Sequence, residues 1–152
     1  FFKSPSSIVG QGEAIVIPKD AKTVHYEAEL VIVIGKKCSK VSKERAMDYV
    51  FGVTAGNDVS ERIWQNDAGV KDVQWWRAKG ADTFGPIGPY IVTGVDYGKL
   101  MLRLRLNGEV TNTIVYHSDS TGTAQIYNPH LFTTVERYSP YSGFIGSFAR
   151  DP

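Results

Sequence analysis

Three observations predict that this chain adopts a mostly β fold of the α+β class. Fifteen glycines and seven prolines divide the chain into short segments. Within these segments, β-branched and aromatic residues occur in runs of strand length. One run, over residues 100–106, alternates leucine with Met or Arg, as a strand with one buried face does. We therefore expect many short strands and few helices.

The same patterns place the individual strands. The expected strands cover residues 14–17, 24–34, part of 84–90, 91–93 and 100–106. In the last of them, Leu100, Leu102 and Leu104 share one face, which predicts a half-buried antiparallel strand. Asn107-Gly108 follows directly and is typical of a hairpin turn.

Two short helices are expected between these strands. Ser42 can cap the first, Glu44 suits its positive N-terminal end, and an apolar stripe follows at Ala46, Met47 and Val50. The second is expected to start near residues 58–61, where the Asn57-Asp58 pair could act as its cap.

Length and composition narrow the class of protein. The 152 residues suffice for one domain that buries roughly 68–70% of its unfolded surface. Seventeen Lys and Arg residues balance sixteen acids without forming a basic stripe, so we expect a small-molecule partner rather than nucleic acid. No apolar run approaches the ~20 residues of a membrane helix, and no leader precedes the first motif. Cys38 is the single cysteine, which predicts a reducing cytoplasm.

Glu27 and Glu29 are the first residues that indicate chemistry. They lie in an expected strand, so both side chains point to one face, roughly 7 Å apart. Like charges at this spacing repel, and a hard divalent cation such as Mg²⁺ or Mn²⁺ would turn the repulsion into binding. A strand with a solvent-facing acidic side explains the pair equally well.

Further polar groups occur at two later motifs. Asp58 ends the small-residue run 52–60, where helix capping is the simpler explanation. Lys79 lies among aromatics and glycines in the run 75–86, and a lysine taken singly is more often a solvated surface residue.

Taken together, these blocks resemble the fumarylacetoacetate hydrolase family. The blocks FFKSPSS, YEAELVIVIG, DYVFGVTAGNDVS, RAKGADTFGPIGP and LRLRLNGEV occur in the family's order. The resemblance covers residues 1–110, which we take as a metal-binding core. Residues 111–152 form a divergent tail, either part of the same domain or partly disordered.

The resemblance implies roles for six residues. Glu27, Glu29 and Asp58 match the metal ligands, and Lys79 matches the catalytic lysine, which the carboxylates would hold in its charged form. Gln65 and Thr83 match substrate-binding positions. The implied cofactor is Mg²⁺ or Mn²⁺, with Ca²⁺ as an alternative.

The resemblance also implies a mixed, curved β-sheet roll, a cytoplasmic homodimer, and a role in aromatic catabolism. The implied function is metal-dependent hydrolysis or lysis of small 2-oxo or β-dicarbonyl carboxylates, in which a C–C bond breaks through a metal-chelated enolate. A family isomerase or decarboxylase, an inactive remnant that binds metal or ligand, and a purely structural β-domain are the alternatives. The family's general base precedes the block that begins at Phe1, so we expect low turnover from these 152 residues alone.

Overall fold

The computed structural model describes residues 1–67, 69, 73–96, 100–107, 109–115, 117–118, 124–125, 135–136 and 147–150. Its elements, in chain order, are η1 (Pro5–Ser7), β1 (Ile8–Val9), β2 (Ala14–Ile17), β3 (Val24–His25), β4 (Ala28–Ile34), η2 (Lys43–Tyr49), β5 (Val50–Asn57), β6 (Ser60–Glu61), α1 (Arg62–Asn66), α2 (Trp76–Gly80), β7 (Gly85–Val92), β8 (Met101–Leu106), β9 (Glu109–Val115), β10 (His117–Ser118), β11 (Ala124–Gln125), β12 (Val135–Glu136) and β13 (Ser147–Arg150). Strands outnumber helices, which confirms the predicted fold class.

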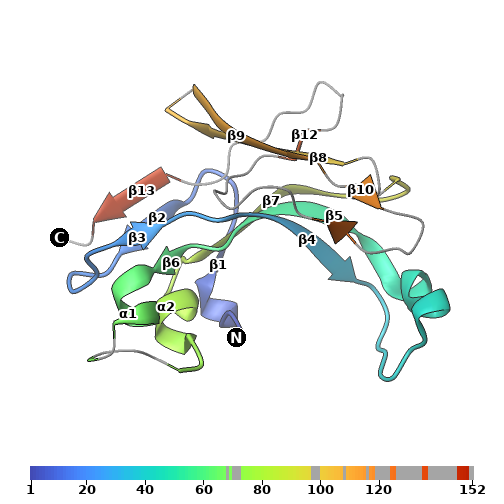
Figure 1. Cartoon of the computed structure of the whole chain (residues 1–152), viewed down its shortest axis with the longest axis horizontal. Coiled ribbons are helices and arrows are strands. Elements are labelled where there is room, and N and C mark those ends of the chain that lie inside the picture. The colour runs from blue at the N-terminus through green and yellow to red at the C-terminus, as the bar shows by residue number, and fades with distance from the viewer. Residues whose placement is uncertain are drawn as a thin grey trace.

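The central sheet has the order β1-β7-β5-β4 and is mixed. Its only parallel pair is β1 with β7, while β5 pairs antiparallel with both β4 and β7. Figure 1 shows β4, β5 and β7 arching across the molecule, with β8 and β9 above them and α1 and α2 gathered at one end. Smaller sheets pair β3 with β6, β2 with β13, β10 with β11, and β8 with β9 and β12.

Close packing of β4 on β5 depends on a glycine. A Cβ at Gly56 would lie 2.5 Å from Cγ2 of Val31 on the neighbouring strand. Only a residue without a side chain therefore allows Val31 to cover β5 at this point. This explains the glycine two residues before Asp58.

The core lies next to the end of the sheet that carries α1 and α2. One buried cluster joins Ile15, Val59 and Phe84, and a second joins Ala21, Trp64 and Ala78. Val59 follows Asp58, and Ala78 precedes Lys79. The core therefore anchors the backbone on which the candidate site residues stand.

Several predicted elements are confirmed with adjusted bounds. Strand β2 matches residues 14–17, and β8 with its buried Leu102 and Leu104 matches the half-buried strand. Asn107 has a left-handed φ of 53°, and β8 pairs antiparallel with β9 across this turn. The two strands expected within residues 84–93 are one strand, β7 (Gly85–Val92). The division at residue 110 stays a prediction, and it falls inside β9.

Two helix predictions were wrong in detail. The helix after Ser42 is the 3₁₀ helix η2, Ser42 makes no side-chain cap, and η2 buries none of its residues. Ala46 and Met47 are therefore exposed instead of forming a packed stripe. The second helix, α1, begins only at Arg62, and its N-cap is Glu61 rather than Asn57 or Asp58. Within the described residues, no helix has the length and apolar character needed to span a bilayer.

Candidate functional site

The predicted strand over residues 24–34 is divided into β3 and β4 at Tyr26 and Glu27. The strand that pairs with it is also divided, into β5 and β6. Between them, the backbone N–H of Val59 donates to the carbonyls of Phe84 and Asn57 rather than to the paired strand. The register of the β3–β6 pair continues into that of β4–β5, so Glu27 still lies opposite Asp58. The Asp58 N–H donates to the Glu27 carbonyl at 2.7 Å.

This break gathers three acidic side chains. One carboxylate oxygen from each of Glu27, Glu29 and Asp58 lies within 4.8 Å of the others. Asp58 is buried, Glu27 is half-buried and Glu29 is exposed. We call these residues the carboxylate triad. Their assignment as metal ligands stays a prediction, but the tertiary structure brings all three together.

Asp58 is held between two lysines. Its Oδ2 accepts from Lys79 Nζ at 2.6 Å, and its Oδ1 lies 2.7 Å from Lys3 Nζ. The N–H groups of Lys3 are directed at the backbone carbonyls of Val59, Lys79 and Phe84. Lys3 therefore forms an ion pair with the buried Oδ1 of Asp58, while its N–H groups also serve three carbonyls. Burial lowers the pKa of Lys3, although Asp58 opposes the shift.

Glu27 is neutralised from two sides. Its Oε2 lies 2.9 Å from Lys79 Nζ, and its Oε1 lies 2.5 Å from an Arg62 terminal nitrogen and accepts from Ser60 Oγ at 3.2 Å. Burial alone would raise the pKa of Glu27, but Lys79 and Arg62 outweigh it and the net direction is down. Glu27 is therefore ionised well below neutral pH.

Glu29 behaves in the opposite way. Although the residue as a whole is exposed, its neighbours partly desolvate the carboxyl group, and this raises its pKa. Repulsion from Asp58 and Glu27 raises the pKa further, and Lys79 and Lys3 offset it only in part. Glu29 therefore feels more repulsion from its two acidic neighbours than attraction from the lysines.

These observations fit a hard divalent cation. The triad offers only oxygen atoms, which Mg²⁺, Mn²⁺ and Ca²⁺ prefer. Asp58 Oδ1 is a buried oxygen whose contact is the charge of Lys3 Nζ at 2.7 Å, so it retains capacity to bind a further cation. A bound cation would use this capacity and would relieve the repulsion that raises the pKa of Glu29.

Lys79 is not a surface lysine. Helix α2 buries it, with 2% of its surface exposed, and two of its three N–H groups meet Glu27 and Asp58. Its Nζ also lies 5.0 Å from the centre of the Phe1 ring. Ion pairing compensates for the burial of a charge that would otherwise be unfavourable.

Gln65 is buried on α1, and Arg62 fixes its amide. Arg62 Nη1 donates to Gln65 Oε1 at 2.8 Å. Since a guanidinium can only donate, the amide NH₂ of Gln65 is the end left for another partner. Arg62 Nε also donates to Nδ1 of the exposed His25, which places that ring's proton on Nε2.

Thr83 lies between α2, which carries Lys79, and β7. Its φ of 66° is left-handed, which is unusual for a β-branched residue. Its Oγ1 accepts from the Val16 backbone N–H on β2 at 2.8 Å. The hydroxyl group therefore ties the turn before β7 to β2, and its predicted contact with substrate stays a prediction.

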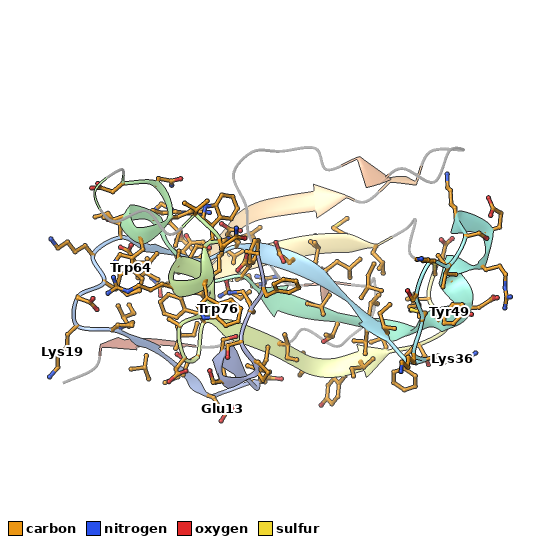
Figure 2. The ribbon with its side chains drawn as sticks, turned by 90° about the horizontal axis from the view of Figure 1, so that it is seen from below. Glu13, Lys19, Lys36, Tyr49, Trp64 and Trp76 are labelled. Carbon is orange, nitrogen blue, oxygen red and sulfur yellow. The ribbon has the colours of Figure 1, made fainter. Side chains whose placement is uncertain are left out.

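The sequence-based reasoning missed Lys3 and Arg62. Both contact the carboxylate triad, at Asp58 and Glu27 respectively. Lys3 belongs to the FFKSPSS block, and Arg62 lies four residues after Asp58. The neighbouring residues in the sequence do not indicate which groups the charged end of either side chain contacts. Figure 2 shows that Trp64 of α1 and Trp76 of α2 lie away from Lys36 and Tyr49, which are at the other end of the molecule.

Comparisons with known proteins agree with this architecture. The model of the fumarylacetoacetate (FAA) hydrolase C-terminal family matches residues 1–126. The uncharacterized protein MJ1656 of Methanocaldococcus jannaschii is 47% identical over 110 residues, which are 72% of this chain and 45% of that protein. The matched region spans half or less of the length of the curated relatives.

Two solved structures are similar to this chain. The 2-hydroxyhepta-2,4-diene-1,7-dioate isomerase from Mycobacterium marinum is 49% identical, with a TM-score of 0.69 over 74% of this chain and 43% of that one. The 5-carboxymethyl-2-hydroxymuconate delta-isomerase from Mycobacterium smegmatis is 32% identical, with a TM-score of 0.81 over 99% of this chain and 69% of that one. On the strength of the family match and these identities, the chain belongs to the fumarylacetoacetate hydrolase family.

Proposed function

We propose that this chain is the catalytic domain of a metal-dependent enzyme that cleaves a C–C bond in a small 2-oxo or β-dicarbonyl carboxylate. Mg²⁺ or Mn²⁺ would be held by the carboxylate triad. The observation that carries the proposal is the gathering of one carboxylate oxygen from each of Glu27, Glu29 and the buried Asp58 within 4.8 Å of one another. Membership of the family supports an enzymatic role.

The residues around the triad have separate roles in this proposal. When bound, the cation acts as a Lewis acid that polarises a carbonyl group. Lys79 keeps one N–H group beyond those that meet Glu27 and Asp58, and this group donates to a substrate oxygen. Gln65 donates from its amide NH₂, which Arg62 orients. Donors fixed in this way stabilise negative charge that develops on the substrate.

Isomerisation is the second candidate reaction. Two similar solved structures are named as a 2-hydroxyhepta-2,4-diene-1,7-dioate isomerase and a 5-carboxymethyl-2-hydroxymuconate delta-isomerase. Both reactions pass through an enolate of the substrate. Only hydrolysis also requires water to attack a carbonyl carbon. The homodimer expected from the family resemblance is part of the same proposal, and sedimentation equilibrium tests it.

Incubation with acetylpyruvate and Mn²⁺ tests the proposed function. A C–C hydrolase releases pyruvate and acetate, which enzymatic assay and NMR quantify. An isomerase changes the ultraviolet spectrum of the enol without releasing either product. Binding of Mn²⁺ without any turnover would identify a ligand-binding domain, and absence of both binding and turnover would contradict the proposal.

A further inference from the structure

Within the part of the chain that the structure describes, the charges of the carboxylate triad and of the basic side chains paired with it cancel. Basic side chains equal to the triad in number contact it: Lys3, Lys79 and Arg62. The group therefore has no net charge when all six residues are ionised. A divalent cation that enters alone leaves two uncompensated positive charges in a partly buried place, which opposes its binding.

Lys3 cannot move away to relieve this excess. Its Nζ is fixed by the carbonyls of Val59, Lys79 and Phe84, at 3.2, 2.5 and 2.8 Å. These carbonyls come from three separate segments of the chain. A flexible surface lysine would swing into solvent when a metal arrives, whereas Lys3 keeps its charge 2.7 Å from Oδ1 of Asp58.

A chelating dianion supplies the missing charge. We propose that this site binds a divalent cation and a dianionic chelating carboxylate as a neutral pair, each raising the affinity for the other, and that Lys3 is the positioning residue that makes binding of the metal alone weak. The inference rests on the proposed function and adds to it a coupling between the two ligands that depends on Lys3. Because the coupling is a free energy between two ligands, it is reciprocal.

Calorimetric titration of Mn²⁺ tests the coupling. We expect saturating oxalate, a dianion, to raise the affinity for Mn²⁺ by at least about tenfold after correction for the Mn²⁺–oxalate complex in buffer. Pyruvate carries one charge and chelates through similar oxygens, so it should raise the affinity by much less. If the affinity for Mn²⁺ is the same in buffer, with pyruvate and with oxalate, the inference is overturned, but the proposed metal site is not. Absence of Mn²⁺ binding under all three conditions would overturn the proposed function as well.

Lys3→Met tests the assigned residue. Removing the fixed charge should strengthen binding of Mn²⁺ alone and reduce the gain from oxalate, whereas damage to the fold would weaken both. Lys36→Met makes the same change in total charge at the opposite end of the molecule (Figure 2) and should leave both affinities as in the parent. Weaker Mn²⁺ binding in a Lys3→Met protein with a parent-like circular dichroism spectrum would overturn the role of Lys3. If the variant does not fold, the comparison of oxalate with pyruvate on the parent decides alone.

Discussion

Lys79 Nζ lies 2.6 Å from Asp58 Oδ2, and both side chains are buried almost completely, with 3% of each exposed. Lys79 comes from α2 and Asp58 from the turn after β5, so the ion pair joins two elements across the site. A buried pair of this kind is expensive to break, since either partner alone is an uncompensated charge.

Lys79→Met should therefore have two effects. It should lower the stability of the metal-free protein by about 3–5 kcal/mol, because Asp58 and Glu27 lose a shared cation. It should also impair oxalate binding without abolishing Mn²⁺ binding, since the triad remains. Thermal melts and calorimetry measure these effects, and Lys19→Met on the exposed surface is the control. Oxalate affinity equal to that of the parent would remove Lys79 from the substrate site.

Glu29→Gln is the cleanest test of the metal site. Glu27 also neutralises Lys79 and Arg62, so its removal would disturb the fold, whereas Glu29 is exposed. We expect the affinity for Mn²⁺ to fall by more than about 100-fold, beyond the 10–100-fold typical of residues that only support a ligand. The melting temperature without metal should stay the same or rise. Glu44→Gln on η2 is the matched control, and an unchanged Mn²⁺ affinity in Glu29→Gln would contradict its role as a ligand.

The raised pKa of Glu29 predicts a pH dependence of metal binding. The folded protein holds a proton on Glu29 at pH values above the ordinary 4.5, so ionisation of Glu29 opposes folding of the metal-free protein as pH rises through this range. Mn²⁺ needs the ionised form and must displace that proton. Its affinity should therefore begin to fall, on acidification, at a pH above that of an ordinary glutamate. Titrations between pH 5 and 8 measure this, and Glu29→Gln should flatten the profile.

Glu61→Gln should destabilise the end of the molecule that carries the site. The buried Glu61 carboxylate accepts backbone N–H groups from Lys22, Thr23 and Trp64 at 3.0, 2.7 and 2.6 Å. A glutamine would direct its NH₂ group at one of these donors, at an expected cost of about 2–3 kcal/mol. Chemical denaturation measures the loss. Glu13→Gln, where an exposed carboxylate accepts one backbone N–H, should cost far less, and equal losses would refute this account.

Much of the β architecture could be predicted because it follows from local patterns. Alternation over residues 100–106 predicted β8, and the Asn107-Gly108 turn predicted its antiparallel partner. The side chains of Glu27 and Glu29 could be expected on one face because strand alternation depends only on neighbouring residues. The helix boundaries were predicted less well, since Glu61 replaced Asn57 and Asp58 as the cap once its carboxylate was buried.

The tertiary structure alone decided which charges meet. Lys3 donates to carbonyls 56 to 81 residues away along the chain, and Arg62 reaches Glu27 across the β3–β6 ladder. No sequence pattern predicts these contacts, because a long basic side chain can reach many positions. Its partners are the carbonyls and carboxylates that the packed core brings within about 3 Å of the charged group. The sequence therefore determined the acidic residues of the candidate site, and the fold determined the cations that balance them.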